Sequence, residues 1–287
     1  MNNEAASDET LLTRLESTAS IERIAFDGGR ICWRRFGQGA PLVLLHGGHG
    51  SWLHWARNVE ALAAHYTMWV PDMPGYGDSD APTGTSLDAL VDATLQALEP
   101  LVPSHTPLRL VGFSFGSLVA AQLAARRGNV SHLGLLGPAA HGGPRRPPGE
   151  LQPRRGLGPG SAQWSAVMRH NLLMHMLHDP AAIDEAALQI HGQACLHTRF
   201  HSKTISRAGG MASILERHHG ALLLAVGGHG VTLDPAFVSK TLGQGHPHCR
   251  IKSIDGAGHW VHYESASKVN QLLLDWLEPR SRPHREC

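Results

Sequence analysis

The chain has 287 residues and is almost electrically balanced, with 25 lysines and arginines against 24 aspartates and glutamates. This balance gives no global positive field that would attract nucleic acid, and no uninterrupted apolar run approaches the roughly 20 residues that cross a bilayer. Composition therefore favours a soluble enzyme with a small-molecule substrate, without a nucleic-acid partner or a membrane span, and it leaves the oligomeric state open.

Neither the start of the chain nor its cysteines indicate export. Residues 1–20 lack the apolar stretch of a secretory signal, so we expect a polar N-terminal extension and a cytoplasmic location. The cysteines, at positions 32, 195, 249 and 287, show no C-x-x-C spacing. This spacing favours free thiols over disulfides or zinc, and no other pattern indicates a metal or a cofactor.

Apolar runs alternate with helical patterns from residue 21 to about residue 140. The first two runs, residues 21–26 and 30–36, predict an antiparallel pair around the Asp27-Gly28-Gly29 turn. The elements that follow are predicted strands over residues 42–46, 68–71, 108–112 and 132–136 and predicted helices over residues 52–65, 86–101 and 117–127. This repetition predicts an α/β fold, with a mostly parallel sheet that helices cover on both faces. Functional groups then gather at the carboxyl ends of the strands.

The strand over residues 42–46 runs into the glycine-rich loop His46-Gly47-Gly48-His49-Gly50. Acyl transfer develops negative charge on an oxygen, and backbone N–H groups stabilise that charge best when they are already aimed at it. The N–H of Gly48 is therefore a candidate oxyanion donor.

The next functional motif is Gly112-Phe113-Ser114-Phe115-Gly116, which has the form G-x-S-x-G and lies between a predicted strand and a predicted helix. A serine hydroxyl is a weak nucleophile, and a sharp strand-to-helix turn exposes it near a base and a helix N-terminus. The two glycines lack Cβ, so neighbouring backbone can approach the turn closely. Ser114 is the candidate nucleophile, and the N–H of Phe115 is the second candidate oxyanion donor.

Residues 141–219 break the alternation of strands and helices. Glycine, proline and arginine are frequent at the start of this segment, and helical patterns follow over residues 164–177, 181–196 and 211–218. We interpret the segment as an inserted helical lid that can move relative to the sheet. Its apolar side chains are available to cover the nucleophile, although packing of the lid onto the body is the commoner role of such residues.

Residues 220–280 return to the α/β pattern, and residues 281–287 form a predicted C-terminal tail. The predicted elements are strands over residues 221–226 and 248–254 and helices over residues 235–242 and 265–277. The loop Gly256-Ala257-Gly258-His259 follows the last strand. His259 is the candidate general base, because a histidine after the last strand completes the chain order of a serine hydrolase of this topology.

These motifs together resemble the α/β-hydrolase superfamily, over residues 21 to about 277. The most specific matches lie in residues 46–48, 71–80, 112–116 and 256–259. The resemblance is closest to bacterial small carboxylesterases and to meta-cleavage-product hydrolases, which break a carbon–carbon bond. It implies the α/β-hydrolase fold with a core over residues 21–140 and 220–280, and it implies turn-forming roles for Asp72 and Asp78.

The resemblance fails at the residue that orients the catalytic histidine. Members of the superfamily usually carry an aspartate at the position that Gly230 occupies here, and the alternative position after residues 132–136 also lacks a carboxylate. Asp234 lies four residues beyond Gly230 and could reach back. Asp234-Pro235 also fits a helix N-cap followed by a proline at the first helical position. The orienting acid therefore stays unassigned, and its loss lowers kcat by about 10⁴ in one well-studied triad.

The sequence predicts a serine-nucleophile hydrolase that cleaves a small, partly apolar carboxylic ester through an acyl-enzyme. Two alternatives stay open. The same serine and histidine serve a hydrolase of carbon–carbon bonds, and the missing acid at Gly230 suits a catalytically impaired protein that binds a small ligand. The fold alone does not choose between esters, thioesters, lactones and carbon–carbon substrates.

Overall fold

A central sheet of eight strands organises the chain, in a computed structural model that describes residues 5–147 and 149–278. The strands follow the order β1-β2-β4-β3-β5-β6-β7-β8. The pairs β1·β2 and β2·β4 are antiparallel, and the other five pairs are parallel. The strands are β1 (Ser20–Phe26), β2 (Gly29–Phe36), β3 (Ala40–Leu45), β4 (Tyr66–Pro71), β5 (Leu108–Phe113), β6 (Val130–Leu136), β7 (Ala221–Gly227) and β8 (Cys249–Ile254).

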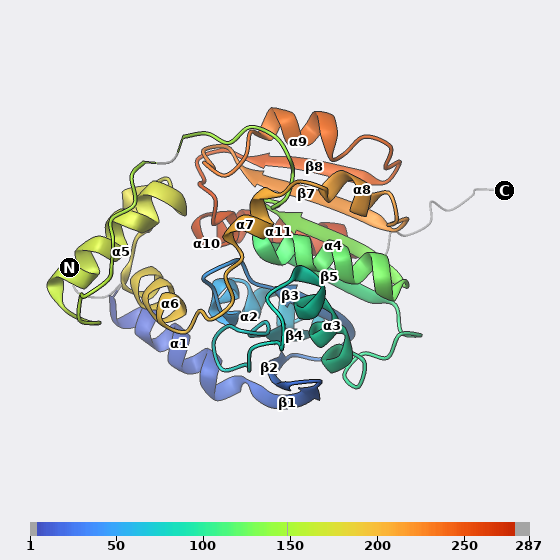
Figure 1. Ribbon diagram of the computed structural model, residues 1–287, viewed down its shortest axis with the longest axis horizontal. Helices are drawn as coiled ribbons and strands as arrows, with labels where there is room; N and C mark the ends of the chain where they lie inside the picture. Colours follow the sequence, from blue (N-terminus) through green and yellow to red (C-terminus); the bar gives the residue numbers. More distant parts are fainter. Residues whose placement is uncertain (1–4, 148, 279–287) are drawn as a thin grey trace.

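Two hydrophobic layers cover the sheet, so the predicted α/β fold with helices on both faces is confirmed (Figure 1). Successive side chains of a strand point to opposite faces, so in β3 Leu42 and Leu44 belong to one layer while Val43 and Leu45 belong to the other. The first layer contains α1 (Ala5–Thr18), α2 (Val59–Ala63) and α11 (Ala266–Leu277). The second contains α3 (Leu87–Leu98), α4 (Phe115–Arg127), α8 (Met211–Leu215) and α9 (Pro235–Thr241).

The predicted helix over residues 52–65 is wrong in one respect, because the segment forms two short helices. A 3-10 helix spans Trp52–Trp55, and α2 begins only at Val59. Asn58 separates them, and its buried side-chain amide donates to the carbonyl of His262 at 3.0 Å and to Oδ1 of Asn270 at 2.7 Å. These tertiary hydrogen bonds fix the chain at Asn58 in a way that helical periodicity does not reveal.

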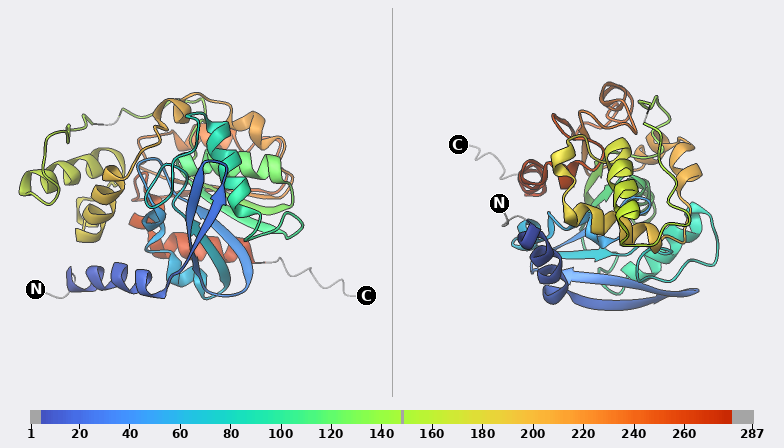
Figure 2. Two further views of the ribbon diagram at one scale, coloured as in Figure 1. Left: turned by 60° about the horizontal axis from the view of Figure 1, so that its bottom comes forward. Right: turned by 90° about the vertical axis from the view of Figure 1, so that its left-hand side faces the viewer.

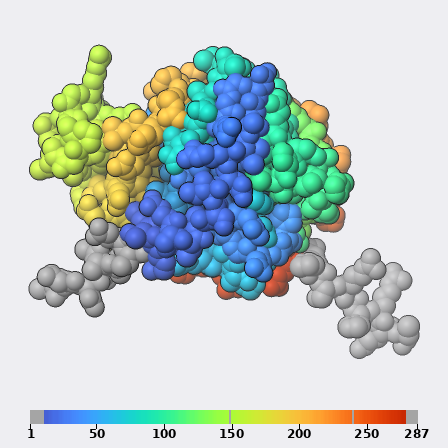
Figure 3. Space-filling model, turned by 90° about the horizontal axis from the view of Figure 1, so that it is seen from below, coloured from blue at the N-terminus to red at the C-terminus, as the bar shows by residue number. Residues whose placement is uncertain are grey.

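The N-terminal extension contains a helix that packs on the body. Leu12 and Leu15 of α1 are buried in the first layer, and Arg14 forms an ion pair with Glu60 of α2 at 2.6 Å. Helix α1 also contacts α6 (Glu185–Leu196), and the two lie side by side in Figures 1 and 3. The extension therefore contributes buried leucines as well as a polar surface.

The predicted lid lies between β6 and β7. Its helices are α5 (Ala162–His175), α6, α7 (Lys203–Arg207) and α8, with a 3-10 helix over Pro180–Ala182. Helices α5 and α6 pack against each other and extend beyond the sheet on one side (Figure 2). The apolar side chains of Trp164, Met168 and Leu172 are buried in the first hydrophobic layer.

Three of the four cysteines lie in the described part of the chain, and all three are free thiols. Cys287 and the predicted tail over residues 281–287 lie outside the described residues. A search of the described helices finds none with the length and apolar character that would let it span a membrane.

Candidate active site

Ser114 occupies a strained turn between β5 and α4. Its backbone φ is 52° and its ψ is −118°, a combination that side-chain-bearing residues rarely adopt. A Cβ at Gly112 would clash with the carbonyl of Gly116, and a Cβ at Gly116 would clash with the carbonyl of His46. The Ser114 N–H donates to the carbonyl of Leu136 at 2.9 Å, which fixes the turn to the end of β6.

The structure brings the candidate nucleophile and the candidate base together from positions 145 residues apart. Nε2 of His259 lies 2.9 Å from Oγ of Ser114. The imidazole is buried, and its ring centroid lies 4.9 Å from that of Phe113. Serine and base are therefore within hydrogen-bond reach, as a general-base mechanism requires.

Burial sets the protonation state of His259. Removal of the ring from water lowers the pKa of His259 well below its usual value, and the neighbouring His175, His262 and Arg145 lower it further. The imidazole is therefore neutral at neutral pH, which is the state that can accept a proton from Ser114.

Glu264 and the lid hold the loop that carries His259. The Glu264 carboxylate accepts hydrogen bonds from the N–H groups of Gly258 at 2.6 Å, His178 at 2.8 Å and Asp179 at 2.7 Å. The Trp260 N–H donates to the carbonyl of Met176 at 2.7 Å. No sequence motif indicates Glu264, because its hydrogen bonds connect two loops that are distant in the chain.

The candidate oxyanion donors also lie close together. A Cβ built at Gly48 would lie 3.7 Å from Cβ of Phe115. Phe115 is the first residue of α4, so its N–H has no acceptor within its own helix. The Gly48 N–H has no backbone acceptor among the described residues. Neither N–H group therefore has a backbone acceptor among the described residues, and their role as oxyanion donors stays a prediction.

Asp72 and Asp78 have structural partners, in agreement with the turn-forming roles that the resemblance implies. The Asp72 carboxylate pairs with Arg34 at 2.9 Å and accepts the N–H of Trp52 at 2.9 Å. Asp78 pairs with the same guanidinium at 2.6 Å. The neighbouring His46 accepts the N–H of Met73 through Nε2 at 2.9 Å, so these loops support the glycine-rich loop over residues 46–50.

Neither position considered for the orienting acid supplies a carboxylate to His259. Gly230 has no side chain, and Asp234 caps α9 by accepting the N–H of Ala236 at 2.9 Å. Nδ1 of His259 lies instead 2.8 Å from Oγ1 of Thr232. No carboxylate in the described part of the chain forms an ion pair or hydrogen bond with His259. Thr232 could not be recognised from the sequence, because the superfamily pattern at this site contains an acid at a fixed spacing and Thr232 does not fit that pattern.

A small cavity of about 80 Å³ adjoins His259. Its walls come from the end of α5, the following loop and the loop after β7. Apolar lining is provided by Leu173, Met174, Met176, Leu177 and Val231, and polar lining by His175, His178, His229 and His259. Met174 and Met176, which belong to the predicted lid, therefore line this cavity, whereas Trp164 packs against Gly192 of α6.

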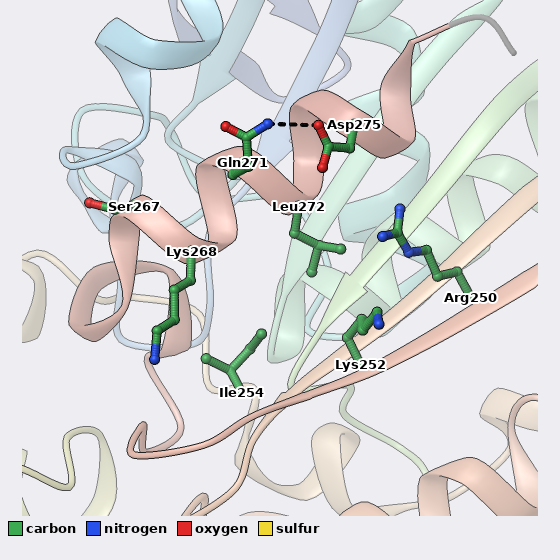
Figure 4. A pocket seen from close by; sticks show the side chains of 8 residues that line it. All are labelled: Arg250, Lys252, Ile254, Ser267, Lys268, Gln271, Leu272 and Asp275. Carbon is green, nitrogen blue, oxygen red and sulfur yellow. Dashed lines mark hydrogen bonds between the residues drawn. The ribbon is translucent and has the colours of Figure 1, made fainter. Parts of the chain in front are cut away.

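A larger surface hollow of about 490 Å³ lies elsewhere, between β8 and α11 (Figure 4). Lys252 and Arg250 reach it from the strand, and Lys268, Gln271 and Asp275 reach it from the helix. None of the candidate catalytic residues lines this hollow, so its size does not make it the active site. The described residues also contain no cluster of His, Cys, Asp or Glu side chains suited to a metal ion.

His262 gives a prediction about acid stability. The side chain is fully buried, its ring centroid lies 4.2 Å from that of Trp55 and 4.6 Å from that of Phe113, and burial lowers the pKa of His262 to about 3. The unfolded chain binds the proton below its ordinary pKa of about 6.5, so the free energy of unfolding should fall by about 1.4 kcal/mol per pH unit for this histidine between pH 6.5 and about 3. We expect His262→Phe to reduce this acid sensitivity in urea titrations at several pH values.

The exposed His105 provides the control for that experiment, because His105→Gln removes an imidazole without changing a buried group. Equal acid sensitivity of wild type and His262→Phe would contradict the prediction.

Comparison with known proteins agrees with this geometry. The protein-family model described as "Alpha/beta hydrolase family" matches residues 42–272. A curated relative, the magnesium-chelatase 30 kDa subunit of Rhodobacter capsulatus, is 25% identical over 258 residues, which cover 84% of this chain and 87% of the relative.

Solved structures share the fold. The naproxen esterase (carboxylesterase NP) of Bacillus subtilis superposes with a TM-score of 0.74 at 17% identity, over 97% of this chain and 99% of the esterase. A meta-cleavage product hydrolase of Pseudomonas fluorescens IP01 superposes with a TM-score of 0.73 at 20% identity, over 89% of this chain and 96% of the hydrolase. The predicted resemblance to bacterial carboxylesterases and meta-cleavage-product hydrolases is thus confirmed, and the chain belongs to the alpha/beta hydrolase family.

Proposed function

We propose that this chain is a serine hydrolase that cleaves a small, partly apolar carboxylic ester through an acyl-enzyme. The observation that carries the proposal is the 2.9 Å separation between Nε2 of His259 and Oγ of Ser114, at a strained turn between β5 and α4. A buried neutral imidazole beside a serine hydroxyl is the arrangement that activates serine as a nucleophile.

The reaction follows from the positions of these groups. Oγ of Ser114 attacks the ester carbonyl carbon while Nε2 of His259 takes the hydroxyl proton. The N–H groups of Gly48 and Phe115 stabilise the oxyanion of the tetrahedral intermediate. Collapse of that intermediate breaks the bond to the leaving alkoxide oxygen, which receives the proton from His259. Water, activated by the same imidazole, then releases the carboxylic acid and restores Ser114.

The small cavity beside His259 supports a small substrate with apolar parts. Its side-chain lining contains leucine, methionine and valine as well as histidines, and it contains no carboxylate. Such a surface accepts a compact group that has both apolar and polar parts.

We also propose that the segment over residues 141–219 acts as a lid. Two of its contacts lie at opposite sides of the site. The Met176 carbonyl accepts the Trp260 N–H next to His259, and the hydroxyl of Ser202 lies where a side chain at Gly48 would project. Movement of the lid would therefore change access to the base and to the oxyanion loop together.

A cytoplasmic location remains part of the proposal. It is supported by the free thiols of Cys32, Cys195 and Cys249, since thiols persist in a reducing compartment.

A fluorophosphonate tests the nucleophile directly. We expect it to modify Ser114 in the folded wild-type protein, because only a serine beside a base and oxyanion donors is sufficiently activated. Mass spectrometry of the modified peptide identifies the site. Ser114→Ala should lose the label, while the matched control Ser253→Ala, which removes an exposed serine on β8, should keep it.

Substrate assays then separate the remaining functions. Burst release of nitrophenol from a short acyl ester supports the esterase. Turnover of a yellow dienol keto acid without ester turnover supports the alternative of carbon–carbon bond cleavage. An absence of label, burst and turnover in folded protein contradicts a hydrolase and supports a small-ligand-binding protein.

A further inference from the structure

We infer that Thr232 is the residue that positions the His259 imidazole, in the place where other members of the superfamily use a carboxylate. This inference rests on the proposed serine-hydrolase function. Oγ1 of Thr232 lies 2.8 Å from Nδ1 of His259, on the side of the ring opposite Ser114. Thr232 is buried, so water does not compete freely for this hydrogen bond.

The chemistry requires one direction for that hydrogen bond. Nε2 of His259 must be unprotonated to accept the proton of Ser114, so Nδ1 carries the hydrogen and donates it to Oγ1 of Thr232. A carboxylate can only accept, and it therefore imposes this tautomer. A hydroxyl can also donate, so Thr232 permits the opposite tautomer, and it stabilises the imidazolium without a full negative charge. The Thr232 arrangement is thus a weaker form of the usual triad.

The start of the lid fixes the backbone of Thr232. Nε2 of His141 lies 3.0 Å from the Thr232 carbonyl, and Nδ1 of His141 accepts the N–H of Gly143 at 3.0 Å. Because Nδ1 is the acceptor, the hydrogen of the neutral ring lies on Nε2 and is donated to Thr232. Burial lowers the pKa of His141, which favours this neutral state. A continuous set of hydrogen bonds therefore joins residues 141–143 to Thr232, His259 and Ser114.

The described groups around His259 include no carboxylate that could replace Thr232 as the hydrogen-bond partner of Nδ1. Gly137 has φ +53° and faces the ring, and a Cβ there would lie 2.9 Å from Nδ1 of His259. The titratable groups that act on His259 include His175, His262, Arg145, His141 and His54. None of these is an anion, so no charge in this set supplies what the absent carboxylate would supply.

Three variants test the inference. Thr232→Val keeps the shape of the side chain and removes the hydroxyl. We expect kcat on a nitrophenyl ester to fall about 10- to 100-fold with little change in KM, because the lost hydrogen bond is made to a charge that forms in the transition state. Thr232→Ser should restore most of kcat. The matched control Thr94→Val removes another buried threonine hydroxyl, on α3 and away from the site, and should leave kcat unchanged.

The pH profile separates positioning from a packing role. Thr232→Val deprives the imidazolium of an acceptor, which lowers the pKa of His259 and moves the acidic limb of kcat/KM to lower pH. Asp234→Asn should change neither kcat nor this limb, since Asp234 caps α9. A Thr232→Val enzyme with full kcat and an unshifted limb would overturn the inference.

The tautomer of His259 can also be measured directly in the wild-type protein. The imidazole ¹⁵N shifts of His259 should show a protonated Nδ1 at neutral pH, and a protonated Nε2 would overturn the role of Thr232. Fluorophosphonate labelling distinguishes a failure of the proposed hydrolase function from a failure of the positioning role of Thr232. Unlabelled wild-type Ser114 rejects the proposed function, whereas labelled, active wild type with an unaffected Thr232→Val rejects only the positioning role.

Discussion

Ser114→Ala and His259→Ala are each expected to reduce kcat/KM by at least about 10³-fold, and the double variant should be scarcely worse than either single variant. The two side chains share one hydrogen bond, between Nε2 of His259 and Oγ of Ser114 at 2.9 Å. A serine without its base and a base without its serine leave the same residual catalysis, which comes from the oxyanion donors and from binding. Steady-state kinetics on one ester measures all three variants.

Surface variants provide matched controls for these kinetics. Ser253→Ala and His105→Ala remove an exposed serine and an exposed histidine and should retain wild-type kcat/KM. If the losses of Ser114→Ala and His259→Ala instead multiply in the double variant, the two residues act independently and the proposed serine–histidine pair is incorrect.

The strained turn at Ser114 could be predicted from the sequence because its constraints fall on neighbouring residues of one short segment. Ser114 needs a positive φ, and the backbone of Gly116 and His46 passes too close for side chains at Gly112 and Gly116. Only glycine satisfies both contacts, so the geometry leaves a pattern in consecutive residues. The positions of the parallel strands along the chain follow from similarly local signals, since buried parallel strands require continuous apolar runs.

The partner of His259 could not be predicted in the same way. The hydrogen bond between His259 and Thr232 depends on how the loop after β7 turns and on the His141 side chain, which reaches Thr232 from residues that follow β6. No residue spacing in the sequence predicts that these three residues lie close together. The division of the predicted helix over residues 52–65 has the same origin, because Asn58 is fixed by Asn270 and by the His262 carbonyl from the end of the chain.

Replacement of Gly230 by aspartate is expected to raise kcat on a simple ester, because it returns a carboxylate to the position that the superfamily normally uses. The structure can accept the side chain. Gly230 does not lie in the positive-φ region, and a Cβ there would lie 3.2 Å from the Gly227 carbonyl oxygen and 3.7 Å from Cα of His259. A shift of a few tenths of an ångström in the loop relieves the closer contact.

The size of the gain depends on how much Thr232 already contributes. An aspartate accounts for about 10⁴ in kcat in a complete triad, so the gain lies below that limit by the share that the Thr232 hydroxyl supplies. Combining Gly230→Asp with Thr232→Val measures this share. If the carboxylate takes over the hydrogen bond from Nδ1, the loss caused by Thr232→Val should shrink in the Gly230→Asp background.

The pH dependence of kcat/KM for Gly230→Asp provides an independent test of the new carboxylate. A carboxylate beside His259 favours the imidazolium, so it raises the pKa of His259 from its depressed value and moves the acidic limb of kcat/KM to higher pH. The gain in kcat/KM should therefore be largest at about pH 8 and should diminish as the pH falls through the new pKa.

Gly230→Asn is the matched control, because it adds the same volume without charge. We expect neither a higher kcat nor a shift of the acidic limb of kcat/KM to higher pH in this variant. Thermal melts establish that each variant is folded. A folded Gly230→Asp protein with unchanged kcat and an unshifted limb would show that position 230 does not reach His259 in this chain.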